Sequence, residues 1–149
     1  MISNFVACKC EAALLIYALN FLCDETVDNG LDGSLPTELR ELIAVRTLWL
    51  FNNNLTGSIP DTLVANHFLE EVRLEHNQLT GNAVPWSQMS YLSQMREWRA
   101  HHNFLSGSLS TFQPAEELEI LDLSWNDLTG LLPPDLWNPP SLKRVSLSR

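Results

Sequence analysis

Apolar residues return along this chain in groups about two dozen residues apart. The groups align on five recurrent asparagines, which are Asn29, Asn53, Asn77, Asn103 and Asn126. The gaps between these asparagines are 24, 24, 26 and 23 residues. Apolar side chains stand eight, five and three residues before four of them: Val45, Leu48, Leu50; Leu69, Val72, Leu74; Met95, Trp98, Ala100; and Leu118, Leu121, Leu123. The chain is therefore an internal repeat, and this repeat decides its fold.

Glycine recurs at a fixed position in every copy, and proline follows it in most copies. A leucine follows two residues after each asparagine and a glycine four residues after it, and most copies then reach an apolar residue followed by proline. The glycines and prolines interrupt every segment before it reaches the length of a stable helix. The period is also too long and too uniform for the hairpins of a β-sandwich. The pattern therefore predicts a solenoid of stacked coils.

The spacing of the apolar residues assigns a strand to each coil. The last two apolar residues before each asparagine are two apart, so they point to the same face of a strand, and the residues between them point to the other face. Strands of successive coils then stack as a parallel sheet. Each asparagine stands where the strand turns away, and its side-chain amide can bond backbone groups that the turn leaves unpaired. We expect these amides to stack as a buried asparagine ladder.

Three segments resemble the plant-type leucine-rich repeat with its N-x-L-T-G-x-I-P motif. They are NNNLTGSIPDTL from Asn52, NQLTGNAVP from Asn77 and NDLTGLLPPDL from Asn126. The resemblance covers residues 29–149 as about five copies, the last one incomplete. It implies a right-handed α/β-type superhelix with a short parallel β-sheet on its concave face, an irregular or 3-10 convex side and a second small strand at L-T-G-x-I-P. It also implies binding of a protein or peptide, often in the ectodomain of a receptor-like kinase or receptor-like protein.

The third and fourth copies depart from the motif. The third carries extra residues near Asn82, Ala83 and Trp86, and the fourth has Trp98 and Ala100 at leucine positions. We expect a local bulge in this part of the solenoid.

The residues between the strand leucines are the candidates for ligand binding. Those predicted on the concave face are Trp49, Phe51, Glu71, Arg73, Glu75, Glu97, Arg99, His101 and Asp122. Exposed aromatic rings are frequent binding hot spots, and the charged residues beside them would form a polar field. Two other interpretations stay open: Trp49 and Phe51 pack against an N-terminal cap, or the charges merely form cross-strand pairs on a solvated face.

The net charge and the lack of catalytic motifs argue against nucleic-acid binding and catalysis. The net charge of −9 disfavours nucleic acid as a partner. No motif places a nucleophile beside a base, so we expect no enzyme activity and no cofactor. His76, His101 and His102 follow one another around two turns, and a metal site there is conceivable, but we interpret them as inert surface residues.

Residues 1–28 lie outside the repeat and have two competing interpretations. The apolar stretch from Ala12 to Cys23 is too short to span a bilayer. It is either a helix that covers the open end of the solenoid, which we favour, or the apolar part of a signal peptide. Cys23 could form a disulfide with Cys8 or Cys10 in an exported protein, and otherwise the three thiols stay reduced.

The last partial copy ends with Val145 and Leu147, which would present apolar side chains to water. Solenoids normally carry capping repeats, so we expect either that the natural product continues or that the sequence is a fragment, in preference to a partner that covers the end. We also expect residues 142–149 to be frayed.

The function predicted for the chain is a monomeric recognition module that binds a protein or peptide, extracellular or linked to a membrane through parts of the gene outside this sequence. The alternatives are a cytoplasmic leucine-rich-repeat scaffold and a purely structural fragment. Asn54-Leu55-Thr56 forms an N-x-T sequon, which could carry a glycan if the protein is exported.

Overall fold

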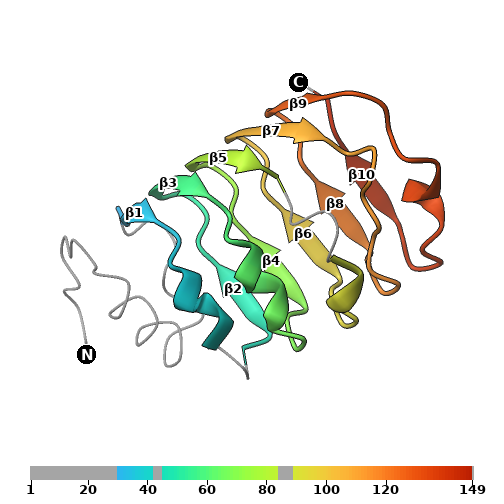
Figure 1. The fold of residues 1–149 in the computed structure, drawn as a ribbon, viewed down its shortest axis with the longest axis horizontal. Coiled ribbons are helices and arrows are strands. Elements are labelled where there is room, and N and C mark those ends of the chain that lie inside the picture. The colour runs from blue at the N-terminus through green and yellow to red at the C-terminus, as the bar shows by residue number, and fades with distance from the viewer. Residues whose placement is uncertain (1–29, 42–44, 84–88, 149) are drawn as a thin grey trace.

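The computed structural model describes residues 30–41, 45–83 and 89–148. The described chain winds through stacked coils, and Figure 1 shows two rows of short strands running along the length of the stack. The predicted N-terminal helix, the three cysteines and Asn29 lie outside the described residues. The described part therefore covers most of the predicted repeat region.

Two parallel sheets run through the coils, each with five strands. The first sheet has the order β10-β8-β6-β4-β2 and the second has the order β1-β3-β5-β7-β9. The strands of the first sheet are β2 (Thr47–Trp49), β4 (Glu71–Arg73), β6 (Glu97–Arg99), β8 (Ile120–Asp122) and β10 (Arg144–Ser146). Those of the second are β1 (Asp32–Ser34), β3 (Asn54–Ser58), β5 (Gln78–Asn82), β7 (Phe104–Ser108) and β9 (Asp127–Thr129). The predicted parallel sheet and the second small strand are thus both confirmed.

Short 3-10 helices carry the chain back on the other side of the coils. They are η1 (Thr37–Glu41), η2 (Asp61–Ala65), η3 (Met89–Tyr91) and η4 (Pro134–Trp137). Pro60 and Pro133 stand directly before η2 and η4 with φ near −70°. Proline fixes φ at about −65°, which suits the entry into a helical turn. The L-T-G-x-I-P segment therefore ends the second strand and starts the return of the chain.

The core lies between the two sheets and the 3-10 helices. Leu48, Leu50, Val72 and Leu74 are fully buried, as the strand periodicity predicts. Burial of a leucine side chain of this kind contributes about 1.5–3 kcal/mol. The core is therefore continuous from coil to coil and not divided between separate domains.

The departures in the third and fourth copies do not disturb the described strands. Trp98 and Ala100 occupy two leucine positions and are fully buried, so a larger side chain is followed by a smaller one. β6 pairs in regular register with β4 and with β8, and β5 pairs in regular register with β7. The described strands therefore keep a regular register, and the expected bulge stays a prediction, because residues 84–88 of that segment lie outside the described residues.

The asparagine ladder joins each coil to the one before it. The Asn77 amide donates to the carbonyls of Leu50 and Leu74 at 2.9 and 3.1 Å, and its Oδ1 accepts from the Leu55 N–H at 3.0 Å. Asn103 and Asn126 repeat these bonds one and two coils further along. The residue before each amide (Asn52, His76, His102 or Trp125) has φ between 53° and 55°. The ladder therefore closes a tight left-handed corner after β2, β4, β6 and β8.

Candidate recognition surface

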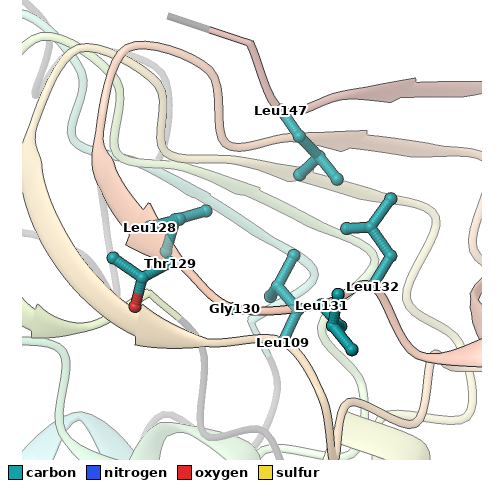
Figure 2. Close-up of a pocket in the computed structure, with 7 residues that line it drawn as sticks. All are labelled: Leu109, Leu128, Thr129, Gly130, Leu131, Leu132 and Leu147. Carbon is teal, nitrogen blue, oxygen red and sulfur yellow. The ribbon is translucent and has the colours of Figure 1, made fainter.

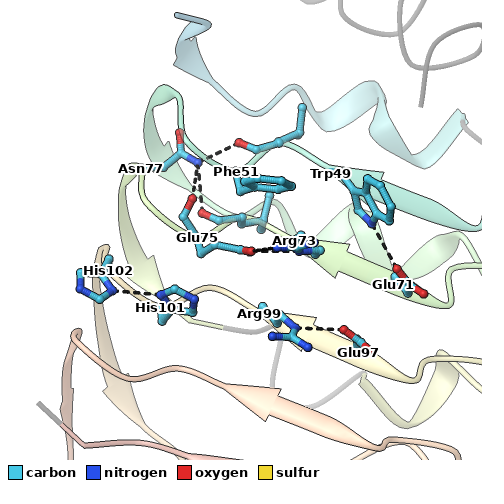
Figure 3. Close-up of polar contacts among 12 residues, drawn as sticks. Trp49, Phe51, Glu71, Arg73, Glu75, Asn77, Glu97, Arg99, His101 and His102 are labelled. Carbon is cyan, nitrogen blue, oxygen red and sulfur yellow. Dashed lines mark hydrogen bonds and ion pairs between the residues drawn. The ribbon is translucent and has the colours of Figure 1, made fainter. Parts of the chain in front are cut away.

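The open face of the first sheet carries the side chains that the sequence predicts for ligand binding. The parallel register aligns them in columns across the strands: Thr47, Glu71, Glu97 and Ile120 in one, and Trp49, Arg73, Arg99 and Asp122 in the next. Phe51, Glu75 and His101 follow two residues further along each chain segment. Figure 3 shows those of β2, β4 and β6 from Trp49 to His101. The predicted residues are therefore neighbours, although not all of them are accessible.

Arg73 lies at the centre of an aromatic and acidic group. Its guanidinium carbon lies 4.2 Å from the centroid of the Phe51 ring and 5.7 Å from that of Trp49. The Trp49 indole N–H donates to Glu71 at 3.2 Å, as Figure 3 shows. Such cation–π contacts contribute about 0.5–2 kcal/mol, depending on desolvation. The predicted packing of Trp49 and Phe51 against an N-terminal cap lies outside the described residues, and within them Arg73 contacts both rings.

Two ion pairs of this face run along the chain of a single coil, whereas a third, between Arg144 and Asp122, crosses from β10 to β8. Arg73 Nη2 lies 2.6 Å from Glu75 Oε1, and Arg99 Nε lies 2.9 Å from Glu97 Oε2. The interpretation of these charges as cross-strand pairs is wrong, because the register places Glu71 opposite Glu97 and Arg73 opposite Arg99. Like charges opposite one another destabilise a sheet unless each finds another partner. Arg73 and Arg99 find that partner within their own coils, and Glu71 accepts a hydrogen bond from the Trp49 indole on the neighbouring strand.

Two predicted binding residues are nearly covered. Glu75 is 3% exposed and Asp122 is 5% exposed. Asp122 accepts from the Ser124 hydroxyl at 2.7 Å and lies 3.6 Å from Arg144. Both residues keep the positions predicted for them on this face, but their side chains are buried.

Glu75 combines burial with an unused oxygen. Arg73 Nε and Nη2 both donate to Glu75 Oε1, at 2.9 and 2.6 Å. The other oxygen, Oε2, is buried without a hydrogen-bond partner. Leaving a buried acceptor unpaired costs about 1–3 kcal/mol, and more when it is charged. A donor from a ligand would recover part of this cost.

Three histidines gather at the edge of this face, just beyond β4 and β6. The ring centroids of His76 and His102 are 4.4 Å apart and stacked, and the Nδ1 atoms of His101 and His102 are 2.9 Å apart. Burial lowers the pKa of His101 below its usual value, and the negative charges of Asp122 and Glu75 oppose that shift. The repeat pattern predicts that these histidines follow one another around two turns, and the structure brings their rings into contact.

Trp125, which the repeat pattern does not single out, also belongs to this cluster. Its side chain is 57% exposed and stacks on His102 with a centroid separation of 5.3 Å. Trp125 stands directly before Asn126, just as His76 and His102 stand directly before Asn77 and Asn103. The register of the ladder could therefore have predicted the stack His76–His102–Trp125.

A small pocket lined mainly by leucines lies at the C-terminal end of the described coils. It has a volume of about 130 Å³, and Figure 2 shows leucines from β9, the following turn and the last coil around it. Leu131 is 84% exposed, and Val145 and Leu147 are partly buried against the core. The apolar side chains most exposed near this end are therefore Leu131 and Leu132, and not the predicted Val145 and Leu147.

Comparison with known protein families gives a match in two parts of the chain. Residues 44–65 and 117–139 match the family described as Leucine Rich Repeat. The chain is 36% identical to Podocan-like protein 1 of Mus musculus over 115 residues, which are 75% of this chain and 19% of the relative. It is 36% identical to Receptor protein-tyrosine kinase CEPR1 of Arabidopsis thaliana over 106 residues, or 70% of this chain and 11% of that protein. The chain thus spans a fifth or less of the length of these relatives.

Solved structures give the same fold. The plant peptide hormone receptor RGFR1, solved in complex with RGF2, matches with a TM-score of 0.75 and 31% sequence identity. The match covers 81% of this chain and 19% of the receptor chain.

Among the residues that the structure describes, no helix has the length and the apolar character needed to span a membrane.

Proposed function

Because this chain is a leucine-rich-repeat protein with plant-type repeats, we propose that it is a recognition module that binds a peptide or protein segment on the open face of its first sheet. The observation that carries the proposal is the group of Trp49, Phe51 and Arg73, which sets two partly exposed rings beside a paired cation. Aromatic and arginine side chains supply most binding hot spots in protein interfaces. RGFR1 was solved with its ligand RGF2, which supports a peptide as the class of ligand.

The charges define the polar part of the proposed site. Arg73, Arg99 and Glu97 are each between a quarter and a third exposed, so they can exchange contacts within the sheet for contacts with a ligand. The unpaired Oε2 of Glu75 would accept a hydrogen bond from a ligand N–H or O–H that reaches beneath Arg73. We therefore expect a ligand with an apolar side chain for Trp49 and Phe51 and a hydrogen-bond donor for Glu75.

Substitution of the central group tests this site. Peptides selected from a random library on the 149-residue chain serve as probes, and their affinities are measured by calorimetry. Trp49→Ala combined with Arg73→Ala should weaken binding by about tenfold or more, because truncating a hot spot costs at least about 1–2 kcal/mol. Tyr91→Ala, which removes an exposed ring from η3 outside this face, is the control and should leave affinity unchanged. Equal affinities for both variants, with circular dichroism showing both folded, would place the site elsewhere.

We also propose that the protein is extracellular or membrane-associated, in line with its resemblance to receptor-like proteins. Asn54 is exposed on β3, where its Oδ1 accepts a hydrogen bond from Gln78 at 3.2 Å. The sequon therefore lies on the second sheet and away from the proposed ligand.

Expression through a plant secretory pathway tests the compartment. Mass spectrometry should find a glycan on Asn54, and Thr56→Ala should abolish it while keeping the asparagine. An unmodified Asn54 together with reduced Cys8, Cys10 and Cys23 would favour the cytoplasmic scaffold.

A further inference from the structure

We propose that His76, His101 and His102 form a binding site for a divalent transition-metal ion of the zinc class. Each histidine offers a ring nitrogen, and these three nitrogen atoms all lie within 4.8 Å of one another. Imidazole is a common ligand of Zn²⁺, Ni²⁺ and Cu²⁺. Three protein ligands with a fourth position left for water is the arrangement of an open zinc site. The recognition function makes no use of this cluster as a metal site.

The coils bring the three rings together from two successive turns. His76 and His102 stand directly before the ladder residues Asn77 and Asn103, so the solenoid repeats their position from one coil to the next. Their φ angles are 55° and 53°. The His76 N–H donates to the His101 carbonyl at 3.1 Å, and the His102 N–H donates to the Ser124 carbonyl at 3.1 Å. The backbone that carries the ligands is therefore held by neighbouring coils before any ion binds.

The geometry requires only side-chain movement to accept an ion. Tetrahedral Zn²⁺ with bonds of about 2.0–2.1 Å places its ligand atoms about 3.3–3.4 Å apart. The Nδ1 atoms of His101 and His102 are already 2.9 Å apart, in a contact for which one ring must carry the hydrogen. A neutral imidazole has one ring hydrogen, which can move to the other nitrogen and leave both Nδ1 atoms free to bind the ion. His76 is exposed, so its ring can turn toward the same point.

The surroundings of the cluster favour a cation. The carboxylates of Glu75 and Asp122 both act electrostatically on His101. Glu75 Oε2 is the buried oxygen without a hydrogen-bond partner. Carboxylates near a histidine ligand commonly accept its second ring hydrogen and strengthen the metal bond. Stacking on Trp125 further limits the orientation of the His102 ring.

Zinc titration of the full chain tests the site. Calorimetry uses a background in which Cys8, Cys10 and Cys23 are serine, so that no thiolate binds the ion. One Zn²⁺ per chain should bind, and both His102→Asn and His101→Ser should weaken it by about tenfold or more. Asn52 and Ser124 hold the corresponding positions in other coils, with Asn52 at φ 55°, so these replacements suit the backbone. His67→Asn is the control, because His67 lies on the return side and its Nδ1 contacts the Tyr91 carbonyl.

A second measurement keeps the histidines intact. In NMR spectra of the same background, Zn²⁺ should shift the ring signals of His76, His101 and His102 and leave those of His67 unchanged. Absence of saturable binding, retention of affinity in both cluster variants, or a shift confined to His67 would overturn the proposal. The titration contains no peptide, so its result is separate from the test of the recognition face.

Discussion

At the scale of single residues, the asparagine ladder shows how a polar side chain stabilises an apolar coil. Asn77 is 7% exposed, yet its amide bonds carbonyls of two coils and accepts an N–H from one of them. Buried backbone groups must be paired, and the Asn77 side chain pairs the carbonyls of Leu50 and Leu74 and the N–H of Leu55. One side chain therefore replaces the hydrogen bonds that the end of the strand gives up.

Asn77→Ala should lower the free energy of unfolding by about 2–4 kcal/mol, because it leaves more than one buried backbone group unpaired. The adjacent Gln78→Ala removes an exposed amide and should change stability by less than about 0.5 kcal/mol. Urea unfolding followed by circular dichroism compares the two. A similar loss for both variants would mean that the ladder bonds contribute little.

At the scale of elements, the second sheet depends on close approach of backbones at its glycines. Gly81 has φ of 74°, and a Cβ placed there would lie 3.2 Å from the Cβ of Ser58 on the neighbouring strand. Gly33 has φ of 89°, with nothing within 4 Å of the same position. The glycine of the L-T-G-x-I-P segment thus serves two needs, which are a left-handed backbone and room for the preceding coil.

Gly81→Ala should destabilise the protein more than Gly33→Ala. Both variants carry the strain of a side chain at positive φ, about 1–2 kcal/mol, and only Gly81→Ala must also displace Ser58. Thermal unfolding of the two variants measures the difference. Equal melting temperatures would show that backbone strain alone explains the glycine.

At the scale of the whole molecule, each coil contacts only its neighbours. In the described chain β10 pairs with β8 alone, whereas β4, β6 and β8 each have a strand on both sides. Lys143 adds one ion pair to Glu119 across the last two coils, on the solvent-exposed surface. Such a stack has its lowest local stability at its ends.

Residues 142–149 should therefore exchange their amide hydrogens faster than Leu121 and Leu123 of the neighbouring coil. Hydrogen exchange followed by mass spectrometry or NMR measures the protection of both segments. Protection of Val145 equal to that of Leu121 would refute fraying at this end and would show that the last coil unfolds only with the rest.

The sequence by itself determined the coil, its strand, its buried positions and the amide at its corner. These features follow from a period of two within the strand and from residues whose backbone preferences are local, such as glycine and proline. Even the unusual pair Trp98 and Ala100 could be assigned to the core, because the register of neighbouring copies fixes which face they occupy.

Only the tertiary structure decided which side chains of different coils meet. Arg73 pairs with Glu75 along its strand and contacts the rings of Trp49 and Phe51, while Glu75 and Asp122 are covered. The three histidines converge although His76 and His102 lie on different coils. These contacts depend on side-chain rotamers and on how coils of slightly different length stack. The periodicity of a single repeat predicts neither the rotamers nor the stacking.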